Sequence, residues 1–458
     1  LKGWTTSSNA TGVSSDGGVV VGNVAGGGWS QAFRWTQADG MEGLGFLTEG
    51  SLSSSAYDIS GDGNVIVGYS YSEEDGTQAF RWTAADGMQA VSTWLTDAGV
   101  SIPADWILTE ANATNTDGSV VAGTGEDPDG NNQSWLARVS DDGDGFLPDT
   151  VAFNNTLIET GSLGVQAGAG LSHLVLFGSH HRSLLDSGLA RTKEESVGIW
   201  TTTDAAHYDN THTSMALTEI GVYKDVATAR VGIGVGQEWA NQNWSLDGGA
   251  KYDGQYLFVE GANTFGEHFE GSVAGYYGWF ETKLDRHYVN GANVDSSVGK
   301  PDTNACALRV RIDWKDATKL VGFHLSPYVV YTWSQTKLDA YTETGGGFPA
   351  QFSSSTWRTN DVRLGVAART ALSGLINLRL GLEAVHRFED SASGSSGQAI
   401  GLWSFNLPGQ SIDQTWGRAT VDVDRRLSDT VALTLGVNAA TSGGDPTYGV
   451  TAGVRANF

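Results

Sequence analysis

The histidines of the chain are the residues best suited to acid–base or metal chemistry, and all nine lie after residue 150. Histidine is the usual base beside a serine or cysteine nucleophile, and with cysteine it is the usual zinc ligand. The first 150 residues contain neither residue type, so they hold no Ser-His-Asp centre, no Cys-His centre and no zinc site of this kind. The single cysteine, Cys306, excludes an internal disulfide framework.

Acidic side chains are the remaining candidates for chemistry in the first part of the chain. Residues 1–150 contain 21 Asp and Glu but only four Lys and Arg. A carboxylate pair for glycosidic cleavage is formally open there, but acids in turns are usually solvated turn formers. The negative charge argues against nucleic acid as a partner. We therefore predict that the chain is not an enzyme and needs no cofactor.

Three clusters contain side chains that can bind metal ions. Two are acidic runs, Glu126-Asp-Pro-Asp-Gly130 and Asp141-Asp-Gly-Asp-Gly145, which lack the closing Glu of an EF-hand loop. The third is the pair His180 and His181, whose side chains point in different directions if they stand next to each other on a helix. We predict no metal site. A flexible acidic linker and hydrogen bonds from the histidines to their surroundings are favoured, with calcium at the acidic runs as the alternative.

The first part of the chain is repetitive. Ser15-Asp-Gly-Gly-Val-Val-Val-Gly22 returns as Gly61-Asp-Gly-Asn-Val-Ile-Val-Gly68 and as Thr116-Asp-Gly-Ser-Val-Val-Ala-Gly123. A second element, Gln31-Ala-Phe-Arg-Trp-Thr36, returns as Gln78-Ala-Phe-Arg-Trp-Thr83. Asp-Gly is a turn dipeptide and the β-branched run after it indicates a buried strand. Repeats of this length with several strands predict a propeller-like or solenoid-like segment.

The last eleven residues alternate strictly between apolar and polar. Tyr448 and every second residue to Phe458 form an apolar face, while Arg455 belongs to the polar face. This alternation is typical of a strand with one apolar side, and about 9–11 residues are enough for a tilted strand to cross a bilayer. Arg455 can then meet water only inside a lumen. The sequence predicts a membrane β-barrel.

Twelve alternating segments follow residue 195. Their predicted starts lie near residues 196, 213, 227, 247, 267, 302, 321, 355, 375, 412, 430 and 446. In two of them the inward positions are explicit, and the residues predicted to face the lumen are Gly232, Gly234, Gly236, Arg309 and Arg311, together with Arg455. An even number of strands, joined alternately by short turns and long polar loops, is typical of bacterial barrels.

The segment before the first predicted strand is partly helical in its spacing and too polar and short to span lipid. It joins the N-terminal part to a strand that starts at the periplasmic side, so we expect it to cross inside the lumen. The residues predicted to form this pore segment are Leu171, Leu174, Val175, Phe177, His180, His181, Arg182 and Leu185.

These features together resemble two known families. The first part is similar to the extracellular repeats named for a His-Ala-Phe (HAF) motif, here with Gln in the His position. The whole chain resembles an autotransporter of type V secretion, and this resemblance implies a passenger, a linker helix through the pore and a twelve-stranded translocator. The terminal Phe458 would be the signal read by the barrel-assembly machinery.

The resemblance sets the expected organisation and role. We expect an all-β fold with a repeat passenger over residues 1–140, a linker over 141–165, a pore helix over 166–194 and the barrel over 195–458. The barrel would lie in the bacterial outer membrane among lipid and lipopolysaccharide, and display its passenger on the cell surface to an unknown extracellular ligand, for adhesion or surface interaction. A ligand-binding receptor or porin, and a surface hydrolase whose catalytic part lies outside this sequence, are the alternatives.

The adjacent pair Asn154 and Asn155 suggests a possible self-cleavage site. Some autotransporters release their passenger between two asparagines in the pore segment, through cyclisation of the first one. The simpler interpretation of this pair is a polar stretch of linker.

Overall fold

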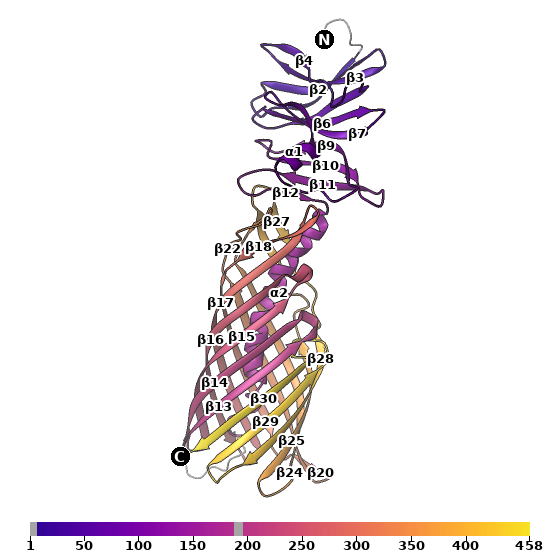
Figure 1. Cartoon of the computed structure of the whole chain (residues 1–458). Coiled ribbons are helices and arrows are strands. Elements are labelled where there is room, and N and C mark those ends of the chain that lie inside the picture. The colour runs from indigo at the N-terminus through magenta and orange to yellow at the C-terminus, as the bar shows by residue number, and fades with distance from the viewer. Residues whose placement is uncertain (1–6, 187–195) are drawn as a thin grey trace.

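The computed structural model describes residues 7–186 and 196–458. It consists of three stacked β-meanders, a twelve-stranded barrel and a long helix that runs from the meanders into the barrel (Figure 1). This confirms the predicted fold class of a barrel with a helix in its lumen, preceded by a β-rich segment.

Each sequence repeat forms one antiparallel meander of four strands. The three meanders comprise β1–β4, β5–β8 and β9–β12, and a short helix, α1, joins the second to the third. The bounds are β1 Ser7–Val13, β2 Val19–Gly26, β3 Trp29–Thr36, β4 Gly40–Gly43, β5 Ser53–Ile59, β6 Val65–Ser72, β7 Gly76–Thr83, β8 Gly87–Ala90, α1 Val91–Asp97, β9 Ile107–Thr114, β10 Val120–Glu126, β11 Asn132–Arg138 and β12 Gly145–Leu147.

The Asp-Gly turns follow from local chemistry. Asp16, Asp62 and Asp117 each accept a hydrogen bond from the backbone N–H two residues further on, at 2.8–3.0 Å. The glycine after each aspartate has a φ of +73° to +78°, which only glycine adopts without strain. Hydrogen bonds from a serine hydroxyl and from the backbone hold the pKa of each of these carboxyls below its usual range.

The same turns link one repeat to the next. Ser15 N–H donates to the carbonyl of Gly61 at 3.0 Å, and Asp62 N–H donates to the carbonyl of Thr116 at 2.9 Å. Equivalent turns are therefore joined in a ladder, and the repeats stack along one direction as in a solenoid (Figure 1).

The barrel is a closed ring. Its first strand, β13, pairs with its last, β30, and β16 pairs with β17, so each strand has two neighbours. Its strands are β13 Val197–Tyr208, β14 Thr213–Val226, β15 Ala229–Asn243, β16 Gly249–Phe265, β17 Phe269–Asn290, β19 Asp302–Trp314, β21 Phe323–Leu338, β24 Ser355–Ala371, β25 Ile376–Arg387, β28 Thr415–Arg426, β29 Val431–Ala440 and β30 Tyr448–Asn457. Each begins within three residues of its predicted start.

The strand connections distinguish the two ends of the barrel. At one end, here called the turn end, lie the start of β13, residue 458 and connections that are mostly tight turns, although Thr318–Leu320 forms the small strand β20. The other end, here called the loop end, contains the longer loops and two short helices, η1 (Asp209–Thr211) and η2 (Ser245–Asp247). The loop-end strands are β18 Asn293–Gly299, β22 Tyr341–Thr342, β23 Ala350–Phe352, β26 Ser395–Ala399 and β27 Ser404–Leu407.

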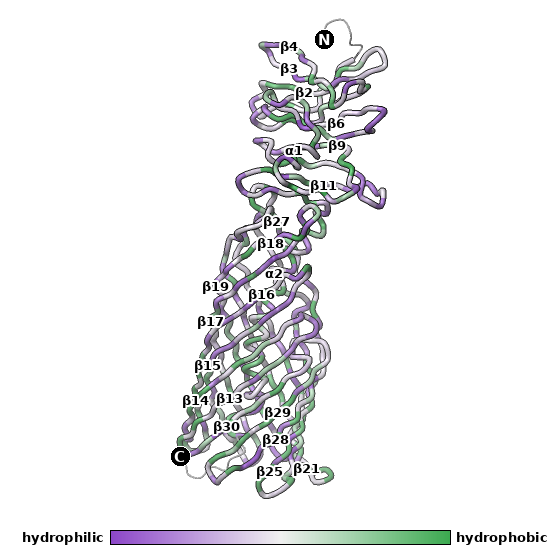
Figure 2. Tube along the Cα trace, viewed as in Figure 1, coloured by the Kyte–Doolittle hydropathy of each residue, from purple (hydrophilic) through white to green (hydrophobic). Residues whose placement is uncertain are grey.

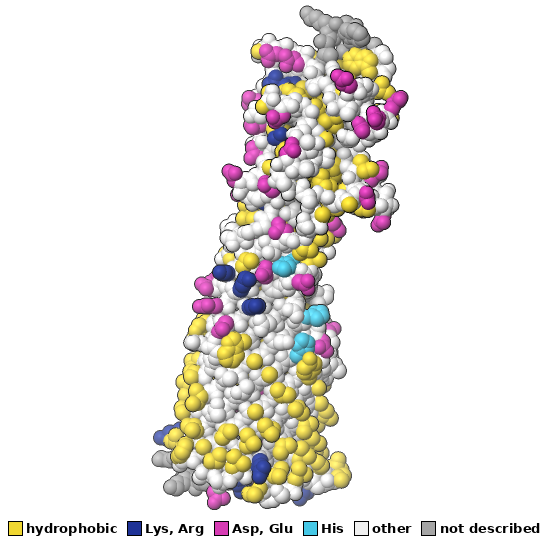
Figure 3. All heavy atoms as spheres, in the orientation of Figure 1, with side chains coloured by type: hydrophobic (Ala, Val, Ile, Leu, Met, Phe, Trp, Pro, Cys, Tyr) yellow, Lys and Arg dark blue, Asp and Glu magenta, His cyan; other side chains and the backbone are white. Residues whose placement is uncertain are grey.

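The two faces of the barrel wall differ as the alternation predicts. Val231, Ile233 and Val235 are 48–56 % exposed on the outside, while Gly232 and Gly234 between them are buried inside. Hydrophobic residues are prominent over the turn-end half of the barrel (Figures 2 and 3), whereas charged residues gather towards the loop end and over the meanders (Figure 3). An apolar outer band of this kind matches a barrel surrounded by lipid.

The third meander rests on the loop end. Arg138 donates to the carbonyls of Ile400 and Gly347, and Gly291 N–H donates to the carbonyl of Phe146 at 2.7 Å. The predicted linker over 141–165 is therefore not a free flexible segment: it contains strand β12 and the start of helix α2, Thr150–Phe177.

The helix also differs from the predicted pore helix over 166–194. It begins at Thr150 and ends at Phe177, and residues 178–186 continue without helical structure. Residues 187–194 of the predicted helix lie outside the described residues. Within the described residues, no helix is long and apolar enough to cross a membrane.

Candidate functional site in the barrel lumen

Helix α2 starts under the loop-end cap. Its N-terminal N–H groups at Val151 and Ala152 donate to the Asp149 carboxylate at 2.8 Å, which satisfies donors that the helix itself leaves free. Buried Phe153 packs edge-on against the ring of Tyr288, 5.4 Å away between centroids. A buried ion pair between Arg286 and Glu343, at 2.6 Å, lies beside this contact.

The middle of the helix passes close to the barrel wall. A Cβ at Gly168 would lie 2.5 Å from Thr336 Cγ2, and one at Gly170 would lie 2.6 Å from Met215 Cε. Real side-chain contacts are longer, so a Cβ at position 168 would displace Thr336 and one at position 170 would displace the flexible end of Met215, and glycine avoids both shifts. The predicted pore residues on this stretch, Leu171, Leu174, Val175 and Phe177, are all at most 3 % exposed and pack in the core shared with the wall.

The wall caps the end of the helix with arginines. Arg309 donates to the carbonyl of Leu176 at 2.5 Å, and Arg418 donates to the carbonyl of Phe177 at 2.5 Å. The last carbonyls of a helix lack partners within the helix, and positive charge is favoured at this end of the helix dipole. The lumen therefore recognises the helix end as well as its sides.

Residues 178–186, here called the plug segment, are tied to the wall by charged hydrogen bonds. His180 Nε2 and Glu219 Oε1 lie 2.7 Å apart, and His181 Nε2 and Asp422 Oδ2 lie 2.9 Å apart. Arg182 donates through both terminal nitrogens to Asp424. His180, Arg182 and their partners are almost completely buried.

The plug backbone is held as well. Arg311 donates to the carbonyl of His181 at 2.9 Å, and Arg230 donates to that of Leu184 at 2.9 Å. Leu184 N–H donates to Glu260 at 2.9 Å. Leu185 is half-buried beside this contact. Buried charges are costly without partners, so this set of pairs has to form together with the wall.

The predicted lumen residues all lie on the inner face. A Cβ at Gly232 would meet Leu184 of the plug segment. A Cβ at Gly234 would meet Glu219, and one at Gly236 would meet Tyr256, so these glycines leave space for the plug and its partners. Arg309, Arg311 and Arg455 are 0–8 % exposed. The arginines at 309 and 311 contact the plug, while Arg455 faces the lumen near the chain terminus.

The structure separates Asn154 and Asn155 from the rest of the pore segment. Both stand in the first turns of α2 at the loop end, where Asn155 is exposed and Asn154 is half-buried. The Asn154 carboxamide oxygen has no hydrogen-bond partner among the described residues.

The acids that receive the plug were not predicted as site residues. Asp422 and Asp424 alternate with outward valines on β28, and Glu219 and Glu260 occupy inward positions of β14 and β16. A charge at an inward position of a lipid-facing strand was the available signal. The sequence did not show that these acids meet residues about 40 to 240 positions away.

No group of three or more His, Cys, Asp or Glu within residues 7–186 and 196–458 is arranged to hold a metal ion. The plug contacts place His180, His181 and Arg182 each against a carboxylate of the barrel wall.

The fold and the site define a class: an apolar-faced, twelve-stranded membrane barrel occupied by its own N-terminal connection. A family model described as the autotransporter beta-domain matches residues 195–438, which is more than half of the 458 residues. The chain belongs to the autotransporter beta-domain family, whose barrel inserts in the outer membrane and translocates a passenger.

Solved structures with a similar fold include the translocator domain of the autotransporter NalP from Neisseria meningitidis, at 16 % identity and a TM-score of 0.49 over 65 % of this chain and 99 % of that one. The beta domain of the Bordetella autotransporter BrkA is similar at 14 % identity and a TM-score of 0.42, over 58 % and 100 % of the two chains. A search of curated proteins found no match to the chain.

Proposed function

We propose that this protein displays its own N-terminal meanders on the cell surface and remains in the outer membrane as their anchor. One observation supports this most directly. Helix α2 and the plug segment connect meanders at the loop end to strand β13, which starts at the turn end. If the loop end faces outward, the connection through the lumen marks the path the passenger took.

The displayed part would act in adhesion or another surface interaction. We propose that its repeats are related to HAF repeats. The stacked turns give an extended, acidic surface, which suits an extracellular ligand and not nucleic acid. We propose no enzyme activity and no cofactor, since residues 1–150 lack His and Cys.

The anchor would have two further partners. Outer-membrane lipid and lipopolysaccharide would surround the apolar band, and the barrel-assembly machinery would take the last strand. Phe458 is 76 % exposed at the turn end, and its N–H donates to the carbonyl of Val197 at 2.8 Å. Its ring is thus free for recognition while its backbone is already paired.

The test is protease treatment of intact cells, with fragments blotted from both ends. We expect residues 1 to about 150 to be lost while a fragment of roughly two thirds of the 48.3 kDa chain stays protected. A periplasmic marker protein must survive in the same sample. Survival of the N-terminal part until the outer membrane is opened would overturn the proposal.

Cleavage between Asn154 and Asn155 remains a separate hypothesis. The intact mass of the purified protein decides it: two fragments that end at these residues would support self-cleavage, and a single unbroken chain would dismiss it. Asn154→Ala would have to abolish any such fragments.

A further inference from the structure

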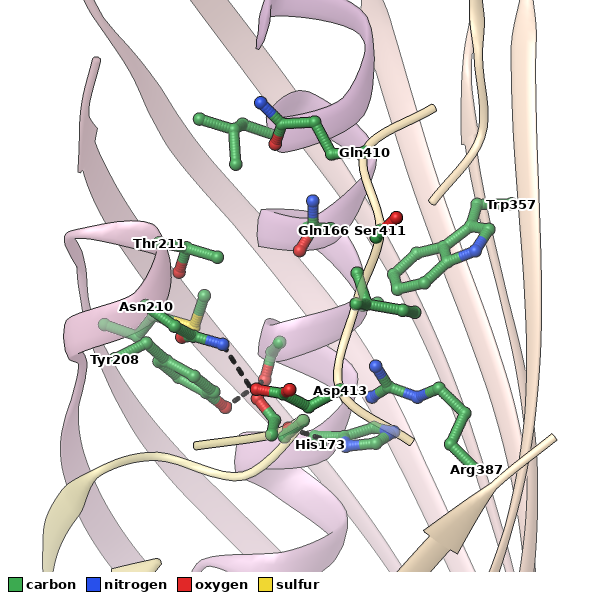
Figure 4. Close-up of a pocket in the computed structure, with 17 residues that line it drawn as sticks. Gln166, His173, Tyr208, Asn210, Thr211, Trp357, Arg387, Gln410, Ser411 and Asp413 are labelled. Carbon is green, nitrogen blue, oxygen red and sulfur yellow. Dashed lines mark hydrogen bonds between the residues drawn. The ribbon is translucent and has the colours of Figure 1, made fainter. Parts of the chain in front are cut away.

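A cavity of about 260 Å³ lies inside the loop end, between helix α2 and the wall (Figure 4). Its floor includes His173 of the helix, Trp357 and Arg387, all mostly buried. Its rim includes exposed Asn210 and Ser411 from the loops around it. The cavity therefore opens through the loops and does not belong to the plug contacts at the helix end.

Arg387 is the unusual group in this cavity. It is 5 % exposed, yet among the described residues its guanidinium group makes no hydrogen bond, and its Nε atom is buried without a partner. Two indole rings hold it in place, with its Cζ atom 5.5 Å from the ring centroid of Trp357 and 5.1 Å from that of Trp416. Buried arginine donors normally have acceptors, so the arrangement leaves a cation fixed in place with its donors unused.

The neighbouring acids, Asp361 and Asp445, bond to other residues through one oxygen each, while Asp361 Oδ2 and Asp445 Oδ1 have no hydrogen-bond partner among the described residues. Asp445 pairs with Arg363 at 2.6 Å and accepts from the Trp416 indole N–H at 2.8 Å. Asp361 pairs with the same arginine, Arg363, at 3.0 Å, and His173 Nε2 lies 3.8 Å from the other oxygen of Asp361. These acids reduce the positive electrostatic potential at Arg387 but accept no hydrogen bond from its guanidinium group. A ligand with one negative charge therefore suits the site better than a dianion, which Asp413 at the rim would also repel.

The rest of the lining fits a small molecule that carries both polar and apolar parts. Gln166, Asn210 and Ser411 offer amides and a hydroxyl, while Leu163, Met215 and Ile412 offer apolar surface. The volume of about 260 Å³ is below the usual range of ligand pockets, which suits a small molecule.

We propose that this cavity binds a small organic molecule with a single carboxylate, which the Arg387 guanidinium group receives as a paired hydrogen bond. A carboxylate matches the planar fork of arginine. The amides and the hydroxyl at the rim accept and donate to hydroxyl groups on the same molecule, and the Trp357 ring packs against its carbon face.

The test is isothermal titration calorimetry of the full chain in a non-ionic detergent. Glucuronate and acetate are the carboxylate probes. Glucose, which lacks the carboxylate, and inorganic phosphate are the controls. We expect saturable binding at one site for at least one carboxylate and none for glucose. No saturable binding of either carboxylate up to about 50 mM, or phosphate binding as tight as theirs, overturns the proposal.

Variants separate the site from the fold. Arg387→Gln should weaken carboxylate binding about 10- to 100-fold, while Arg358→Gln, an exposed arginine outside the cavity, should leave it unchanged. Ala169→Leu fills the cavity from the helix without touching the guanidinium group and should abolish binding. Folding is checked by heat-modifiable migration on gels, and if Arg387→Gln does not fold, Ala169→Leu alone decides. Binding that survives in folded Ala169→Leu refutes the site.

Discussion

Arg309 offers the sharpest test of how the lumen is closed. Its guanidinium group is fully buried, donates to the carbonyls of Leu176 and His180, and pairs with Glu260 at 3.2 Å. Arg309→Met keeps a side chain of similar length and removes all three contacts. The two carbonyls then lack this donor, and the Glu260 carboxylate stays buried with the Leu184 N–H, at 2.9 Å, as its only donor among the described residues.

The size of the effect follows from these contacts. Removing one partner of a buried ion pair costs about 3–5 kcal/mol, and each orphaned acceptor adds about 1–3 kcal/mol. Water that enters the site would satisfy the two carbonyls, which leaves the ion-pair cost, and the remaining N–H on Glu260 keeps that cost at its lower end, at about 3 kcal/mol. With about 1.4 kcal/mol for each factor of ten, opening of the plug should become roughly 100-fold more frequent.

The assay is single-channel recording in planar bilayers. We expect the wild-type protein to be closed almost all of the time and Arg309→Met to open in brief events roughly 100-fold more often. Arg358→Met, an exposed arginine on β24, is the matched control and should behave as wild type. The double variant Glu260→Gln with Arg309→Met removes both charges and should restore closure at least tenfold. Equal opening in all four proteins would refute the electrostatic account of the plug.

Three further perturbations test other parts of the fold. Gly168→Val should lower the free energy of unfolding by about 1–3 kcal/mol because its side chain would collide with Thr336. In the control Gly164→Ala the nearest atom is 3.3 Å from the new Cβ, so this variant should be neutral or slightly more stable. Urea unfolding followed by heat-modifiable migration measures both. The folded-state pKa of Asp62 is lowered, so its stabilisation is present above the unfolded pKa near 3.8 and is lost as pH falls through the folded value. Asp62→Asn should therefore reduce the pH dependence of hydrogen exchange between about pH 5 and 2 at the turn of the second meander, while the turns at Asp16 and Asp117 keep theirs. Gly68→Ala should loosen the second meander by about 2 kcal/mol or more, since a Cβ there would overlap the Ser55 carbonyl, and unchanged proteolysis of the meanders would contradict this.

The barrel was predictable because its signal is local. Inward glycines between outward valines on β15 and polar positions between apolar ones on β30 appear in the sequence as a period of two, and lipid imposes this period on every strand. The turn aspartates were equally local: Asp62 and the glycine after it determine the turn by themselves.

Helix α2 was harder to predict for a physical reason. Its glycines at 161, 164, 168 and 170 lower helix propensity, and the sequence shows their number but not their purpose. At three of them a Cβ would meet a side chain of the wall or of the loop-end strand β26 at 2.5–2.6 Å, so close packing and not local preference explains these glycines. The prediction accordingly placed the helix start too late, at residue 166 rather than Thr150.

The receiving side of the plug required information that no local pattern contains. His181 and Asp422 are 241 positions apart, and Arg182 and Asp424 are 242 apart. Their pairing depends on how the barrel closes and how far the plug segment descends. The sequence pattern indicates candidate residues on one side of each pair, while the three-dimensional fold determines which acid each one meets.

The seam of the barrel also constrains the order of assembly. Strand β13, the first of the barrel, pairs with β30, the last, from Gly198 opposite Asn457 to His207 opposite Tyr448. The ring therefore cannot close until the final strand of the chain has been made and delivered. Until then β13 and β30 are two unpaired edges, and the space between them is a lateral gap through which α2 could be enclosed from the side. Once β13 and β30 have paired, any segment that enters or leaves the lumen has to pass through one of its two ends.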